Sequence, residues 1–459
     1  MDIKMKHAFK FSSLFLACSL ALSGCGGGSS SNNNPSVNNN SCTSPDSSAT
    51  DLQKAKNFIN SSNAILANAQ TTFNTHQPAD LSGAEELSAA TSAVSSLIGY
   101  ASTKANGGSL TLSTSEIQTE LAINGDQNIF SNINGLTVSV NNGTVTVNGT
   151  FTLKIQTGYS YTTIYTPIYG DAISVNVNNF AAKIPSENTT GTNYNAQLNA
   201  NSAISVTLAN GKTTTLKANS NSTATLAYQT SNTLQNQIDS SVIPNSASIN
   251  IAGISVISGT TKLSLDQFTL TGQKVQYTEG SSVVKTSLVP TKLLLKGSAT
   301  QDSNTAAIDA TINLTNDLSQ VVKLDSAGNE TSTGFVKGNF TLNVSTTIKV
   351  GTQTNVFNAK FAGDRTAFNA AQLSNIELSV NCDKLTGTAT YTGATTSQPE
   401  ALKVIIKHPN GASTDIKNIL DFTTSDIIVN GHVEGTISKT SNSLYQAKFN
   451  DGFIIVIAP

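Results

Sequence analysis

The pattern of apolar and polar positions divides the chain into a short helical part and a long β part. In residues 51–75 the apolar side chains recur every three or four positions, the period of one helix face. A second such stripe runs from Ala84 to Ile98. Thr50-x-x-Gln53 and Ser82-x-x-Glu85 have the spacing of capping boxes at helix starts. The sequence therefore predicts an antiparallel helical hairpin over residues 51–104, which covers a sheet edge or mediates oligomerisation.

Beyond Gly107-Gly108 the apolar period changes to two, which is the period of a β-strand with one buried face. Asn142-Gly143 is typical of a two-residue type I′ turn. This turn would pair Val140 with Val145 and Val138 with Val147 on one face. We expect the second strand to continue that face through Gly149, Phe151, Leu153 and Ile155.

Two strands share the form V-x-G-x-F-T-L-x-[I/V], at residues 147–155 and 336–344. A fainter third copy is Val429-x-Gly431-x-Val433-x-Gly435-x-Ile437. The similarity indicates either duplication of a β-unit or the ordinary resemblance between alternating strands.

Strands of twelve to fifteen residues are longer than the usual five or six. Further strands are predicted at residues 262–272, 291–299 and 307–314, and Phe453–Ile457 should be a buried central strand because both faces are apolar. The predicted fold class is mainly β, with long antiparallel strands that form a sandwich or a curled sheet. We divide the β region into a first part, 105–258, and a second part, 259–459.

Charge and composition limit the classes of partner that the protein can have. The chain has 26 Lys and Arg against 28 Asp and Glu, a net charge of −2, and its only arginine is Arg365. This balance argues against a nucleic-acid partner, which leaves a basic footprint. No apolar run approaches the roughly 18 residues of a membrane-spanning helix.

Catalytic and metal-binding patterns are sparse. His76, His408 and His432 lack the close spacing of a zinc site, and no nucleophile-elbow motif is present. His408 lies in a predicted turn, while His432 and Glu434 form either a ligand pair or an exposed polar face. We therefore expect no metal, no cofactor and no enzymatic activity.

The N-terminus carries a secretion signal. Basic residues precede an apolar run that ends in Leu22-Ser23-Gly24-Cys25. This stretch resembles the signal of bacterial lipoproteins, and the resemblance covers about the first 25 residues. It implies that residues 1–24 are removed as a signal peptide, that Cys25 carries the lipid, and that residues 25–50 form a flexible tether. Gly26, where an Asp would favour inner-membrane retention, indicates the outer membrane, on either its periplasmic or its surface face.

Two further sets of residues stand out. Cys42 and Cys382 would share an oxidising compartment, so they are a candidate disulfide. Tyr159, Tyr161, Tyr165 and Tyr169 take alternate positions, which places them on one face of an extended chain and makes them a candidate ligand patch. The alternative for the tyrosines is a cluster in a long hairpin loop, where Pro167 interrupts a regular strand.

These patterns favour an outer-membrane lipoprotein with a non-catalytic binding or structural role in the cell envelope. Its partners are the membrane, through the lipid, and an envelope glycan, lipid or protein. A rival hypothesis is a carrier that holds lipid or another hydrophobic ligand in a curved β-sheet cavity. A lipidated transmembrane barrel and a lipidated envelope hydrolase are weaker hypotheses for the same pattern.

Overall fold

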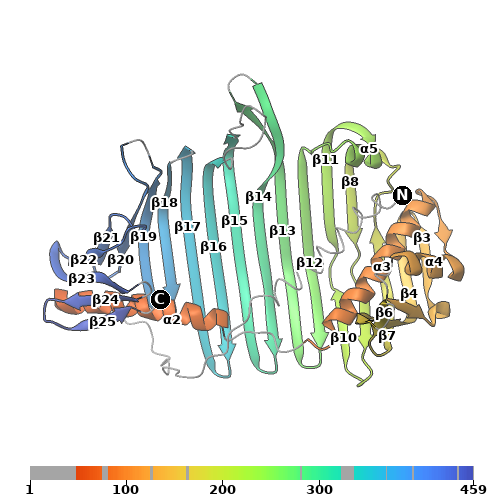
Figure 1. The fold of residues 1–459 in the computed structure, drawn as a ribbon, viewed down its shortest axis with the longest axis horizontal. Coiled ribbons are helices and arrows are strands. Elements are labelled where there is room, and N and C mark those ends of the chain that lie inside the picture. Colours follow the sequence, from red (N-terminus) through yellow and green to blue (C-terminus); the bar gives the residue numbers. More distant parts are fainter. Residues whose placement is uncertain are drawn as a thin grey trace. The chain divides into compact units, whose positions relative to one another are not determined.

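A computed structural model describes residues 48–74, 81–124, 128–161, 165–279, 282–321, 335–367, 370–394, 397–441 and 444–457. The chain is mainly β, as the alternating pattern predicted: two N-terminal helices are followed by a large antiparallel sheet (Figure 1). The chain forms two compact units. Among the described residues, unit 1 comprises 81–274 and 295–303, and unit 2 comprises 48–74, 275–294 and 304–457. This division differs from the linear one expected from the sequence.

Unit 1 is a sheet with helices packed on its apolar face. Asn142 and Gly143 adopt φ angles of 49° and 74°, and the turn pairs Val138 with Val147 and Val140 with Val145. The predicted type I′ hairpin is therefore confirmed. Its second strand buries the expected alternate residues, from Val145 to Leu153.

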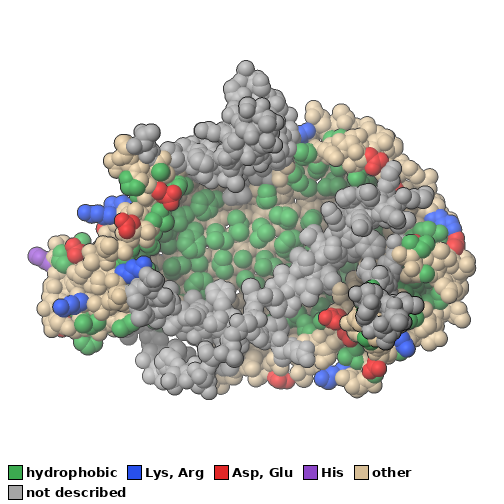
Figure 2. Space-filling model, viewed as in Figure 1, with side chains coloured by type: hydrophobic (Ala, Val, Ile, Leu, Met, Phe, Trp, Pro, Cys, Tyr) green, Lys and Arg blue, Asp and Glu red, His purple; other side chains and the backbone are tan. Residues whose placement is uncertain are grey.

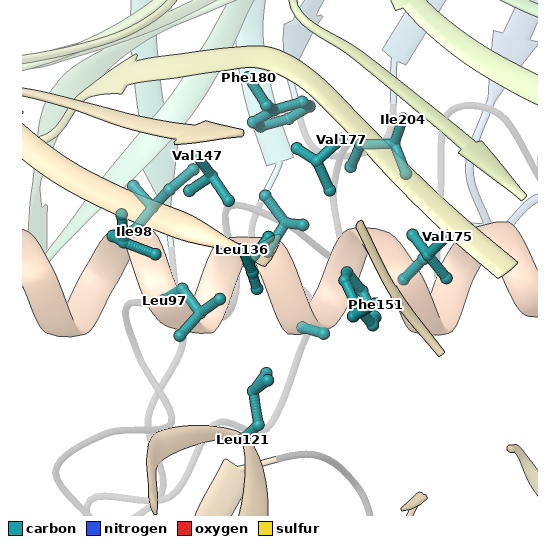
Figure 3. Packing of buried hydrophobic residues seen from close by; sticks show 14 of the residues in the cluster. Leu97, Ile98, Leu121, Leu136, Val147, Phe151, Val175, Val177, Phe180 and Ile204 are labelled. Carbon is teal, nitrogen blue, oxygen red and sulfur yellow. The ribbon is translucent and has the colours of Figure 1, made fainter. Parts of the chain in front are cut away.

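The core of unit 1 is filled. Leu97 of helix α3 and Val147 of strand β4 are fully buried, and Phe151 is only 2% exposed. Figure 3 shows Leu97 and Ile98 of the helix close to the sheet residues of this cluster. A close-packed interior of this kind leaves little room for changes of side-chain volume.

Gly149 shows why the shared strand motif contains a glycine. Its φ is 117°, a conformation that L side chains rarely adopt, and a Cβ there would collide with the carbonyl oxygen of Gly135. The register of β4 against β7 shifts between Val147 and Gly149. Gly338, the equivalent glycine of the second copy, also has a positive φ, of 143°. The shared motif thus marks an irregular strand position in both units.

The elements of unit 1 are α3 (Ala84–Ala105), β1 (Leu110–Thr111), α4 (Thr114–Asn124), β2 (Ile129–Ser131), η1 (Ile133–Gly135), β3 (Thr137–Asn141), β4 (Thr144–Lys154), β5 (Gln156–Tyr161), β6 (Tyr165–Tyr169), β7 (Ile173–Lys183), β8 (Thr190–Leu198), β9 (Ala203–Thr207), β10 (Thr213–Ala218), β11 (Ser222–Thr233), α5 (Leu234–Asp239) and β12 (Ser246–Ser258). Strands β13 (Thr261–Glu279) and β14 (Ser282–Gln301) contribute residues to both units.

Unit 2 also places one helix on an antiparallel sheet. Helix α2 (Asp51–Asn74) buries Ala55, Phe58, Ile59 and Ile65 against residues of the strands β18 to β24. The strands of this unit are β15 (Asn304–Val321), β16 (Phe335–Val350), β17 (Gln353–Ala367), β18 (Ala370–Val380), β19 (Asp383–Thr392), β20 (Ala401–Lys407), β21 (Ala412–Ile416), β22 (Thr424–Val429), β23 (His432–Ser441), β24 (Leu444–Phe449) and β25 (Ile454–Ile457).

Both predicted N-terminal helices are present, and each contributes to one core. The buried face of α2 belongs to the core of unit 2, and that of α3 belongs to the core of unit 1. An apolar stripe specifies that a helix packs on something apolar, and it does not specify which sheet. Each helix therefore covers the core of its own unit.

Two strand predictions are wrong. The faint third copy of the motif is not a single strand, because Asn430 and Gly431 have positive φ angles and form the turn between β22 and β23. The segment predicted as a central strand contains β25, which pairs only with β24 among the described strands. Its residues Ile454 and Val456 are 48% and 59% exposed.

Candidate functional site

An apolar face runs across the strands β15 to β20 of unit 2. Residues directly opposite each other in an antiparallel pair lie on the same face. The register therefore aligns one row of apolar residues across the sheet. This row consists of Ile312, Leu342, Phe361, Ile376, Gly387 and Ile406.

Neighbouring rows on the same face are also apolar. On one side lies the row of Ala310, Val344, Ala359 and Leu378, and on the other side Phe340, Gly363, Leu373, Ala389 and Val404. From Phe340 to Val344 the face measures about 13 Å along the strands, and from β15 to β20 about 24 Å across them, at 3.3 Å per residue and 4.8 Å per strand.

The opposite face of these strands is polar. It carries Asn343, Lys360, Glu377 and Thr386 in one aligned row. Hydrogen-bond donation from Asn375, followed by the charges of Lys384 and Lys360, lowers the pKa of the solvated Glu377 carboxyl. The sheet of unit 2 is thus strongly amphipathic, as the sequence alternation indicated.

Helix α2 covers one end of the apolar face. Phe357, Leu378, Val380, Leu385 and Ile406 pack with the core beneath the helix. Farther along the strands, a set of half-buried residues belongs to no core cluster in the described part of the chain. We call this set the open apolar face, and it consists of Ile312, Phe340, Leu342, Val344, Phe361, Leu373, Ile376 and Val404. Figure 2 shows hydrophobic side chains gathered over the strands β15 to β18.

The open apolar face was missed as a site because each of its strands looked ordinary by itself. Alternation shows that one face of a strand is apolar, but coverage of that face depends on where the helix lies. Large uncovered apolar surfaces on soluble proteins commonly mark binding sites.

A polar cluster fastens the middle of α2 to the sheet. The Ser61 hydroxyl donates to Asp383 Oδ1 at 2.7 Å, and Ser61 Oγ lies 3.2 Å from His408 Nε2. The Asn410 backbone N–H donates to His408 Nδ1 at 3.2 Å. Since Nδ1 accepts, Nε2 carries the proton and donates to Ser61. The histidine therefore has no lone pair directed at the serine hydroxyl, and the cluster acts as a clamp on α2 rather than as an activated nucleophile.

His408 was predicted as a turn residue, and it does precede the turn closed by the bond from Gly411 N–H to the His408 carbonyl. Its ring also contacts Phe58 of α2 edge to face, with centroids 6.4 Å apart. No local pattern signals this contact, because Phe58 and His408 are 350 positions apart. His432 is exposed at the start of β23, and in the described residues no group of three or more His, Cys, Asp or Glu could hold a metal ion.

Cys382 lies beside the same clamp, in the turn between β18 and β19. Asn381 has a φ of 51°, and Val380 pairs with Asp383 across the turn. Cys382 is disulfide-bonded. Cys25 and Cys42 lie outside the described residues, so the lipid site and the pairing of Cys42 with Cys382 stay predictions.

The tyrosine segment extends the β4–β7 hairpin of unit 1. Strand β4 pairs with β7 as far as Leu153 and Ile173, and the chain then continues as the separate two-stranded ribbon β5–β6. We call this ribbon, residues 156–161 and 165–169, the tyrosine arm. Contrary to expectation, β6 runs through Pro167, which is acceptable where no partner strand needs its N–H.

The register of the arm pairs Tyr161 with Tyr165 and Tyr159 with Pro167. Tyr159 is 53% exposed and Ile168 is 47% exposed, whereas Tyr169 is half-buried. The side chains of Tyr161 and Tyr165 lie outside the described part of the chain. The arm contains no charged residue, so any contact it makes relies on rings, hydroxyls and backbone groups.

No protein-family model and no curated protein matches this sequence. Within the described residues, no helix is both long enough and apolar enough to cross a bilayer.

Proposed function

We propose that this protein is a lipid-anchored, non-catalytic binding protein of the bacterial outer membrane that holds an amphipathic lipid against the open apolar face of unit 2. The observation that carries the ligand assignment is the size of that face beyond the cover provided by α2. The anchor rests on the resemblance of Leu22-Ser23-Gly24-Cys25 to a lipoprotein signal.

The chemistry of the face favours acyl chains. Its residues are aliphatic or aromatic and carry no charge. One leaflet of a bilayer has a hydrocarbon thickness of about 15 Å, half of the roughly 30 Å core. A single acyl chain is therefore close in length to the roughly 13 Å that the open apolar face measures along the strands. Such binding would remove both the chain and the face from water, which is favourable in proportion to the apolar area buried.

The ligand assignment is tested by placing a charge on the face. Leu342→Glu puts a carboxylate in the central row, while Thr341→Glu puts the same group on the exposed polar face of the same strand. The wild-type protein should bind parinaric acid, a fluorescent fatty acid, and the hydrocarbon diphenylhexatriene. Leu342→Glu should weaken both by at least about tenfold, since the charge would lose its hydration beneath the ligand, and Thr341→Glu should bind both like the wild type.

Circular dichroism and the thermal unfolding midpoint of both variants would establish that the fold is retained. A wild-type protein that binds neither probe, or a folded Leu342→Glu variant that binds both with unchanged affinity, would contradict the assignment.

The anchor has its own test. Cys25→Ala should abolish palmitate labelling and leave the signal peptide uncleaved, because the lipid is attached through the cysteine sulfur. A precursor that is still labelled after this substitution would show that Cys25 is not the lipid site.

The tyrosine arm supports a second binding function, contact with an envelope glycan. Exposed tyrosine combines an apolar ring with a hydroxyl, which suits the faces and hydroxyls of sugars, and an isolated two-stranded ribbon gains little stability from exposing Tyr159 and Ile168. Replacing Tyr159, Tyr161, Tyr165 and Tyr169 by Ser should abolish retention on purified envelope glycan. Replacing the same four by Phe should retain part of it through the rings.

Equal retention of wild type and the folded Ser variant would exclude the arm as the glycan contact. If the Ser variant loses its far-UV circular dichroism, the tyrosines are structural instead.

A further inference from the structure

A threonine, Thr346, lies among the apolar residues on the helix-facing side of β16. Thr346 lies on β16 between Val344 and Ile348, and its cross-strand neighbours are Ile308 and Phe357. The Thr346 hydroxyl oxygen is shielded from solvent and has no hydrogen-bond partner among the residues that the structure describes. Buried hydroxyls nearly always have a partner, because an unmade hydrogen bond is costly.

The surroundings of Thr346 do not explain why a threonine stands there. Valine has the same shape without the hydroxyl and would satisfy the packing against Val344 and Ile348. The neighbouring position Thr347 belongs to the opposite face, where it pairs with Val356 and Ala307. Two other polar residues on this face, Asn355 and Asp383, accept hydrogen bonds from Asn381 and Ser61. The Thr346 hydroxyl differs from them because it has no partner among the described residues.

We propose that Thr346 is the polar contact of the bound lipid: its hydroxyl donates a hydrogen bond to a carbonyl or carboxylate oxygen of an acyl group. This inference rests on the proposed function and deepens it, since it names the ligand as a fatty acid or fatty acyl ester rather than a plain hydrocarbon. An acyl oxygen is an acceptor that can enter an apolar site at the end of an apolar chain.

The position of Thr346 also gives the ligand a direction. Its neighbour Phe357 packs with the core beneath α2, so the acyl oxygen lies at the side of the face next to the helix. The chain then extends along the strands past Val344 and Leu342 toward Phe340. From Thr346 to Phe340 the strand spans about 20 Å at 3.3 Å per residue, enough for the roughly 15 Å of a leaflet chain.

The experiment compares two probes and three variants. Thr346→Val removes the hydroxyl and keeps the shape, Thr346→Ser keeps a hydroxyl, and Thr347→Val makes the same change as the first on the opposite face. Parinaric acid has a carboxylate, whereas diphenylhexatriene has no hydrogen-bonding group. We expect Thr346→Val to bind parinaric acid about three- to tenfold more weakly, the range of a net hydrogen bond, and diphenylhexatriene with unchanged affinity.

The remaining variants separate this contact from packing. Thr346→Ser should recover much of the affinity for parinaric acid, and Thr347→Val should bind both probes like the wild type. Without ligand, Thr346→Val should unfold at the same temperature as the wild type or higher, because it removes an unpaired buried hydroxyl.

Three outcomes would overturn the inference. Unchanged binding of parinaric acid by Thr346→Val would show that the hydroxyl does not touch the ligand. Equal weakening for both probes would show a packing effect, and a large loss of stability without ligand would show that the hydroxyl has a partner within the protein. A failure of the proposed function looks different, because the wild type would then bind neither probe.

Discussion

The two units share one arrangement, but their helices cover the apolar face of the sheet to different extents. Each places an amphipathic helix on the apolar face of an antiparallel sheet. In unit 1, α3 and α4 meet a core in which Val94, Leu97 and Val147 are fully buried. In unit 2, α2 covers the end of the face at Val380 and leaves the rows around Leu342 half-buried.

This difference in coverage decides whether the apolar face of a sheet stabilises the fold or remains available to a ligand. In a filled core, the favourable free energy of apolar burial is realised when the chain folds, and no apolar surface remains for a ligand to bury. An open face gains part of that free energy only when something else covers it. The same alternating sequence therefore serves stability in unit 1, and we propose that it serves recognition in unit 2.

The sharpest test of this comparison removes one phenylalanine from each unit. Phe151→Ala should destabilise unit 1 by about 3–5 kcal/mol, the usual cost for a buried phenylalanine. Phe361→Ala should destabilise unit 2 by about half of that or less, because its ring is only half-buried. Urea unfolding followed by hydrogen exchange of β4 and β17 would measure both changes. Equal costs would show that the face at Phe361 is covered as completely as the core at Phe151.

Sequence patterns predicted local features better than they predicted which elements pack against each other. Asn142-Gly143 encodes its hairpin through backbone conformation, so the turn and the pairing of Val140 with Val145 followed from neighbouring residues. In Asn430-Gly431 the same turn chemistry competes with the alternation across positions 429–437, and the predicted strand is a hairpin. Where turn chemistry and alternation conflict, the positive φ of Asn-Gly decides.

Long-range features could not be read from the sequence. The clamp joins Ser61, Asp383 and His408 across more than 320 positions, and each of the three is ordinary in its own segment. Phe453–Ile457 is apolar on both faces, yet β25 is an edge in the described sheet because strand order depends on the whole fold. The sequence does not reveal the open apolar face for the same reason, because the burial of Leu342 depends on how far α2 extends over the sheet.

The second prediction concerns the attachment of α2, which sets how much of the face stays open. A disulfide from Cys42 to Cys382 would tie the segment before α2 to the β18–β19 turn. Ser61 contacts Asp383 ten residues into the helix, about 15 Å from Asp51 at 1.5 Å per residue. The eight residues between Cys42 and Asp51 can span more than that distance.

Replacing both Cys42 and Cys382 by Ser should lower the stability of unit 2 by about 2–4 kcal/mol, the usual contribution of a native disulfide. Peptide mapping without reduction would identify the bridge directly. Recovery of Cys42 as a free thiol in the denatured, unreduced protein would contradict the pairing.

The third prediction tests the clamp with two neighbouring serines. Ser61→Ala removes the hydrogen bond to Asp383 and the contact with His408, and it should destabilise the docking of α2 by about 1–2 kcal/mol. The Ser62 hydroxyl donates to the Phe58 carbonyl within the helix, so Ser62→Ala should change the stability by less than about 0.5 kcal/mol. We expect faster hydrogen exchange in α2 for Ser61→Ala alone. Equal exchange in the two variants would show that the clamp does not stabilise the docking of α2.

The smallest predicted effect is a dependence of α2 docking on pH. Lys56 of α2 donates to Asp451 Oδ2 at 2.6 Å, and this bond, followed by the Phe453 backbone N–H, lowers the pKa of the Asp451 carboxyl. A folded pKa below the unfolded value stabilises the protein above the unfolded pKa, and the stabilisation is lost as the pH falls through the folded pKa. The loss therefore begins below about pH 4. Asp451 is solvent-exposed and salt screens such pairs, so the effect is small and best measured as the urea midpoint at low ionic strength.

The decline in midpoint from pH 6 to pH 3 should be smaller for Asp451→Asn than for the wild type or for Asp421→Asn, an exposed aspartate on the β21–β22 connection. If the urea midpoints of all three proteins decline in parallel, the Lys56–Asp451 pair contributes nothing to holding α2 on the sheet. The docking of α2 then depends on its apolar contacts, the clamp at Ser61 and the other hydrogen bonds between the helix and the strands.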